Sequence, residues 1–138
     1  MIRYDKKIFQ EIEVTAQISS FCGEGNVEEW HVMLHVQAGG FFSEQMERLH
    51  QAESLLMGMQ ERKGVKCVAR RYFLSDSANQ YREMSLKQTD AVSVIQQPPL
   101  DGSKVALWLY LTRGMEVVQE HGTTVCQSNG YIHLWRMG

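Results

Sequence analysis

Histidine and cysteine are the residues of this chain whose chemistry depends most on spacing. His31 and His35 are four residues apart in a segment with strand periodicity, so both are expected on one face. Four residues along a strand span about 13 Å, which is too far for two ligands of one metal ion. We therefore interpret both histidines as part of a solvated or interfacial face. The sequence predicts no metal and no cofactor.

Cys126 lies between His121 and His133 near the C-terminus, so a Cys/His nucleophile pair is one interpretation of this segment. Such a pair needs contact in space and a third group that orients the histidine. A buried strand cysteine is the simpler alternative. The three cysteines form no CxxC pair, which argues against a disulfide framework and a zinc site. An odd number of cysteines without a disulfide framework favours a reducing, cytoplasmic setting.

The charge balance argues against two classes of partner. The formal net charge is -2, so nothing draws the whole chain to nucleic acid or to an anionic membrane. RNA cleavage has little support from so acidic a chain without a clear acid/base pair. A local basic cluster comprises Arg62, Lys63, Lys66, Arg70 and Arg71. It is either a solvated helix end plus the outer face of a strand, or a phosphate or carboxylate site.

The elements that must position these residues follow from hydrophobic periodicity. Strict alternation predicts strands over 11–19 and 30–36, and further strands are expected at 65–74, 91–95 and 105–111. Apolar residues at helical spacing predict a long helix over 42–59, with Ser43 as N-cap and Gly64 as its stop. Ser75 and Asp76 are expected to cap a short helix that runs to residue 84. Asn129-Gly130 predicts a terminal hairpin that joins 123–126 to 131–135.

This order of elements predicts one domain over residues 1–138, with a core at about 11–112 and a C-terminal extension at 115–138. Two adjacent strands, then helices between strands, are typical of the α+β class: a mixed β-sheet with two helices packed on one face, followed by a C-terminal β-hairpin. No signal peptide or apolar span is visible.

Three stretches resemble the YjgF/RidA superfamily, whose fold is also called chorismate mutase-like. Residues 45–59 are similar to its long helix. Residues 67–76, Cys-Val-Ala-Arg-Arg-Tyr-Phe-Leu-Ser-Asp, resemble its third strand and the entry to its short helix. Residues 91–94 up to Pro98 resemble its penultimate strand and proline. The resemblance implies a homotrimer with ligand clefts between subunits.

In the best-studied branch of that family, the clefts hydrolyse enamines and imines to keto acids and ammonia. An arginine grips the substrate carboxylate there, and a glutamate positions water. The arginine position falls here on Thr89, or on Asp90, and the glutamate position falls near Ala106. None of these side chains can perform those roles. The resemblance thus implies a divergent member that binds or transforms a small organic acid. The alternatives are a non-catalytic trimeric binding or scaffold protein and a deaminase with substituted site residues.

The resemblance also implies which residues line the cleft. They are Tyr81, Thr89, Ser93, Gln96 and Tyr110, and ordinary polar surface is the alternative interpretation. Trp108 and Tyr110 are expected on one face of the strand at 105–111. There they either belong to the core or anchor an interface between subunits.

Overall fold

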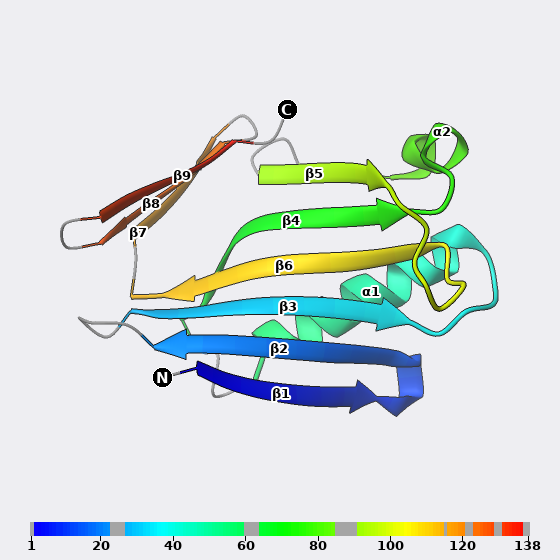
Figure 1. Cartoon of the computed structure of the whole chain (residues 1–138), viewed down its shortest axis with the longest axis horizontal. Helices are drawn as coiled ribbons and strands as arrows, with labels where there is room; N and C mark the ends of the chain where they lie inside the picture. The colour runs from blue at the N-terminus through cyan, green and yellow to red at the C-terminus, as the bar shows by residue number, and fades with distance from the viewer. Residues whose placement is uncertain are drawn as a thin grey trace.

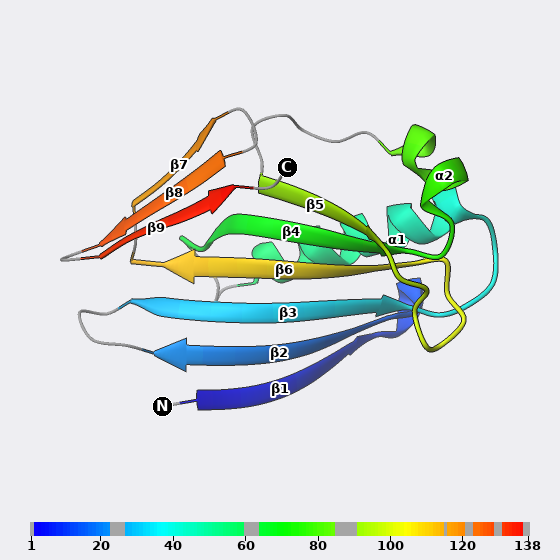
Figure 2. The same ribbon diagram turned by 45° about the horizontal axis from the view of Figure 1, so that its top comes forward.

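A single mixed sheet carries most of the described chain. The structure is a computed structural model that describes residues 2–22, 27–59, 64–84, 91–114, 116–120, 123–128 and 131–136, with side chains up to residue 114. Six strands form the sheet in the order β1-β2-β3-β6-β4-β5 (Figures 1 and 2). These strands are β1 (Ile2–Phe9), β2 (Val14–Cys22), β3 (Glu28–Val36), β4 (Lys66–Leu74), β5 (Ala91–Gln96) and β6 (Val105–Arg113).

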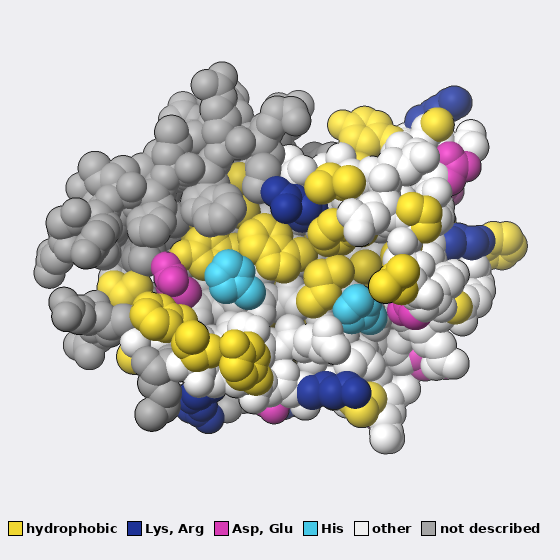
Figure 3. Space-filling model, viewed as in Figure 1, with side chains coloured by type: hydrophobic (Ala, Val, Ile, Leu, Met, Phe, Trp, Pro, Cys, Tyr) yellow, Lys and Arg dark blue, Asp and Glu magenta, His cyan; other side chains and the backbone are white. Residues whose placement is uncertain are grey.

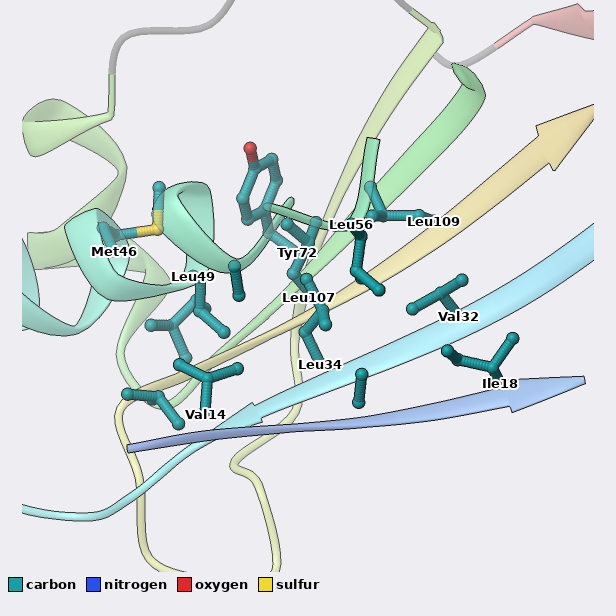
Figure 4. Packing of buried hydrophobic residues seen from close by; sticks show 14 of the residues in the cluster. Val14, Ile18, Val32, Leu34, Met46, Leu49, Leu56, Tyr72, Leu107 and Leu109 are labelled. Carbon is teal, nitrogen blue, oxygen red and sulfur yellow. The ribbon is translucent and has the colours of Figure 1, made fainter. Parts of the chain in front are cut away.

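One long helix covers one face of this sheet. Helix α1 (Phe42–Met57) lies behind the strands in Figure 1 and packs its apolar face on β2, β3 and β6. The packed residues alternate along each strand, as a half-buried strand requires. Figure 4 shows Leu49 and Leu56 of the helix above Val32, Leu34 and Leu107, and all five side chains are fully buried. The predicted α+β class with a mixed sheet is confirmed.

The connections place α1 by elementary topology. Strands β3 and β4 both run antiparallel to β6, which lies between them, so the chain must cross over through α1. Strand β4 then pairs in parallel with its other neighbour, β5. The link between those two strands includes the short helix α2 (Ser77–Gln80) and the 3-10 turn η4 (Tyr81–Glu83). Both lie at the C-terminal ends of β4 and β5 (Figures 1 and 2).

The first strand of the sheet is absent from the sequence-based expectation. β1 pairs with β2 over its whole length, and six of its eight residues are exposed. The predicted strand at 11–19 also begins later, because a 3-10 turn, η1 (Gln10–Ile12), precedes it. Glu13 then takes a left-handed conformation with φ 56° and lets the chain reverse from β1 into β2.

The predicted helix ends are wrong in detail. Phe41 rather than Ser43 is the N-cap of α1, and it makes no side-chain capping bond. The helix ends at Met57, and Gly58 rather than Gly64 follows it. Asp76 precedes α2 without capping it through its side chain. Its backbone N–H donates instead to Gln80 Oε1, 3.0 Å away, so a glutamine inside the turn satisfies the free donor.

The C-terminal residues form a second, separate sheet. The expected hairpin is present as β8 (Thr123–Ser128) and β9 (Tyr131–Arg136), and a further strand, β7 (Glu116–Glu120), pairs with β8. This small antiparallel sheet lies close to β4 (Figure 2). Among the described residues, no helix has the length and apolarity that a membrane span needs.

Candidate functional site

The sheet face opposite α1, called the outer face below, presents an unusual set of side chains. Residues that alternate with the core positions point to it, and Figure 3 looks onto it. Hydrophobic side chains and histidines gather there. Four large apolar side chains of β1 and β2 are exposed on this face: Ile2 (59%), Tyr4 (79%), Ile8 (58%) and Phe21 (46%). Contiguous apolar surface that is exposed on a protein commonly marks a site of interaction with another molecule.

Strand register places three rings side by side at the centre of the outer face. Tyr110 of β6 is opposite His31 of β3, and Trp108 follows two residues earlier on the same strand. The His31 ring stacks on Tyr110 with centroids 5.0 Å apart and lies 5.8 Å from the Trp108 ring. The Trp108 and Tyr110 rings are nearly parallel at 6.5 Å. These three residues are called the aromatic strip.

Arg71 lies at one end of the aromatic strip. It is opposite Trp108 on one side and Ser93 on the other, because β4 lies between β6 and β5. The guanidinium carbon Cζ lies 5.6 Å from the centre of the Trp108 ring, in cation–π contact. Within the described part of the chain, Arg71 makes no ion pair, and its buried Nε has no hydrogen-bond partner.

Glu29 lies at the other end of the strip. The Tyr110 hydroxyl donates to Glu29 Oε1 over 2.6 Å, so this phenol fixes the position of the carboxylate. Among the residues that the structure describes, no cation pairs with Glu29. Arg71 and Glu29 thus have no ionic partner among the described residues, and three rings lie between them.

Within one chain, the described residues of the predicted cleft do not lie together. Tyr110 is opposite Ala69 and Gln96 is opposite Leu74, so about 16 Å of strand separates their backbone positions. Gln96 also points to the helix side, where its Oε1 accepts from the Ser77 backbone and hydroxyl at 3.2 and 2.7 Å. It thus ties α2 to β5.

The other three predicted cleft residues are separated as well. Tyr81 is 54% exposed in η4, beyond the strand ends. Thr89 lies outside the described residues. Ser93 is on the outer face beside Arg71, so Ser93 and Tyr110 are the predicted residues that share a surface with the strip.

The predicted basic cluster is divided between the two faces of β4. Arg70 points to the helix side, where its Nη1 pairs with Glu53 Oε1 at 2.8 Å, while Arg71 points outward. Lys66 is exposed at the start of the strand, and Arg62 and Lys63 lie outside the described residues. The side chains of His121, Cys126 and His133 are also outside them. A site formed by Arg70 and Arg71 together is excluded by this alternation.

A second polar cluster lies between α1 and β4. The Tyr72 hydroxyl and His50 Nε2 are 2.9 Å apart, and burial raises the pKa of Tyr72 to about 12. The other side of His50 borders an open groove of about 840 Å³ that Glu47, Leu55 and Glu83 also line. The described groove residues include no cation opposite these carboxylates, and the groove is wide. We treat this cluster as part of the core that fixes α1 on the sheet.

His35 has a different neighbour from His31. It lies at the end of β3, near Asp101 of the loop before β6. Burial opposes ionisation of Asp101, but hydrogen bonds from the Ser103 hydroxyl and backbone, with the charge of His35, outweigh it and lower the pKa of this carboxyl. No group of three His, Cys, Asp or Glu side chains in the described residues has the geometry of a metal site.

The outer face suits recognition better than catalysis. Its centre offers flat rings with the Arg71 guanidinium at one end of the strip and the Glu29 carboxylate at the other. Sequence reasoning selected Trp108 and Tyr110 but missed the pairing of Glu29 with Tyr110 and the stacking of Arg71. Two arginines in succession on a strand were the available signal, because alternation must send them to opposite faces.

Comparison with known proteins adds no relative. No family model matches the chain, and no curated protein and no solved structure matches it.

Proposed function

We propose that the chain is a divergent YjgF/RidA-like protein that acts as a non-catalytic, homotrimeric binding or scaffold protein, with the outer face as the contact between subunits. The observation that carries this proposal is the aromatic strip, which lies on a sheet face that α1 leaves uncovered. Tyr110 is buried in the single chain, Trp108 is half-buried and His31 is exposed. Tyrosine and tryptophan are enriched in the centres of protein interfaces.

The architecture supports the family part of the proposal. Strand β4 carries the stretch that resembles the family's third strand, and it leads directly into α2, as the resemblance implies. Strand β5 carries the second stretch and pairs in parallel with β4. The long helix α1 carries the third stretch and lies on the opposite face from the strip.

The non-catalytic part rests on side-chain chemistry. Ala106, at the position that matches the family's glutamate, is buried and carries no acid or base. Glu29, the carboxylate nearest to the aromatic strip, is engaged by the Tyr110 hydroxyl. The arginine position matches Thr89, whose hydroxyl cannot grip a carboxylate in two hydrogen bonds.

Solution mass tests this proposal. Trp108→Glu places a charge in the centre of the outer face, so it is expected to convert the trimer into a monomer that remains folded. Trp108→Phe keeps a ring there and should keep the trimer. Tyr81→Glu, at an exposed aromatic outside the outer face, is the matched control and should also remain trimeric. A Trp108→Glu protein with unchanged mass would contradict the proposal.

A small organic acid is a second candidate ligand of this surface, at the edge of a cleft between subunits. One observation favours it: Arg71 offers a guanidinium without a carboxylate partner in the described chain, beside the hydroxyl of Ser93. Arginine binds carboxylates through two parallel hydrogen bonds. A thermal-shift screen of keto acids and ring carboxylates tests it, with Arg71→Gln as control, because a ligand of the folded state raises its melting temperature.

A further inference from the structure

The two charges at the ends of the aromatic strip are complementary, yet neither has an ionic partner in the described chain. Arg71 is half-buried, stacks on Trp108 and has a buried Nε without a hydrogen bond. Glu29 is half-buried as well and accepts one hydrogen bond, from Tyr110. A partly buried charge without a counter-charge costs free energy, so each group favours an opposite charge brought by a second molecule.

The two groups are too far apart to pair within one chain. Arg71 is on β4 and Glu29 is on β3, with β6 between them. Arg71 is opposite Trp108 and Glu29 is opposite Thr112, so they also differ by four residues along β6. Two strand spacings of about 4.8 Å and four residues at about 3.3 Å put their backbones on the order of 16 Å apart. The distance is spanned by the aromatic strip.

We infer that the occupant of the outer face is a second copy of this chain, and that Arg71 of one subunit pairs with the partner subunit's Glu29. This inference rests on the proposed self-association and names the contact that fixes its register. A three-fold axis in front of the outer face brings the Arg71 end of one strip to the Glu29 end of the next subunit's strip. In a trimer, every subunit gives Arg71 to one neighbour and Glu29 to the other.

The contacts already present prepare both groups for this role. The Tyr110 hydroxyl holds Glu29, and the Trp108 ring lies against the Arg71 guanidinium, whose buried Nε has no hydrogen-bond partner among the described residues. Less side-chain entropy is therefore lost when the pair forms across the interface. The exposed apolar side chains of β1 and β2 extend the same surface and remove further area from water.

Charge reversal and its repair test the inference. Arg71→Glu and Glu29→Arg each place like charges opposite one another, and each is expected to raise the dissociation constant of the assembly at least ~30-fold. The double variant restores opposite charges at every interface and should recover most of the wild-type affinity. Arg3→Glu, an exposed charge reversal on the opposite face of the edge strand β1, is the control and should change little. Light scattering across a dilution series measures all five proteins, with circular dichroism to verify the fold.

The outcomes separate this inference from the proposed function. A monomeric wild type would overturn both. A wild-type oligomer that survives both single reversals, or a double variant that stays dissociated, would overturn the ion pair while leaving self-association in place. A carboxylic acid could instead dissociate the wild-type oligomer and raise the melting temperature of the monomer in a way that depends on Arg71. That result would assign the guanidinium to a small ligand and would also overturn the ion pair.

Discussion

Replacing Tyr72 by phenylalanine should change how the stability of this protein depends on alkaline pH. The Tyr72 side chain is 2% exposed under α1, and its hydroxyl lies 2.9 Å from His50 Nε2. Burial favours the neutral phenol and raises its pKa from 10.0 to about 12. The unfolded chain therefore releases this proton at lower pH than the folded protein does. The resulting stabilisation is fully present below pH ~10 and is lost as pH rises towards ~12.

The size of this effect follows from the shift. A difference of about two pKa units corresponds to roughly 3 kcal/mol when the titration is complete, of which roughly 1.4 kcal/mol is lost by pH ~11. Tyr72→Phe removes the titrating group, so this part of the alkaline destabilisation should disappear. At pH ~7 the same change should cost about 1 kcal/mol, because the hydrogen bond to His50 is lost.

Urea unfolding at a fixed protein concentration, repeated between pH ~7 and pH ~11, measures both quantities. The exposed Tyr81→Phe is the matched control, and it should retain the wild-type slope above pH ~10. An identical alkaline slope in wild type and Tyr72→Phe would refute the reasoning, because the buried phenol would then not be the group that titrates.

Three further changes test the core and its polar contacts. Leu107→Ala empties a fully buried position and should lower the free energy of unfolding by about 2–5 kcal/mol in urea titrations, and a loss below ~1 kcal/mol would show that the site is not packed as described. Glu53→Ala leaves the largely buried Arg70 without this carboxylate and should cost about 3–5 kcal/mol, whereas a neutral result would mean that solvent already screens the pair. Ser103→Ala removes a hydroxyl donor to Asp101 and should raise the pKa of that carboxyl towards its ordinary value in a carbon NMR titration; an unchanged pKa would assign the depression to the backbone N–H donors and His35.

The strands that bury one face could be predicted from the sequence because their alternation reports that burial. Strand β3 is an example: Val32 and Leu34 are fully buried on one side, and His31 is exposed on the other. β1 could not be found in this way. It is an edge strand with six exposed residues of eight, so its charged residues carry no burial pattern.

The outer face could be predicted only in part. The periodicity of β6 places Trp108 and Tyr110 together, but strand order decides which residues surround them, and strand order arises from the long crossover through α1. The orientation of Gln96 could not be predicted either. Side chains alternate along β5, so the face on which Gln96 lies depends on where the strand begins, and the local sequence does not define that point.

The solution mass of the wild-type chain tests the central claim most directly. Light scattering over a range of protein concentrations is expected to give three times the chain mass of 15.9 kDa, which falls to one chain mass in Trp108→Glu. A wild-type protein that stays at the mass of one chain throughout would contradict the proposal that the outer face joins copies of this protein.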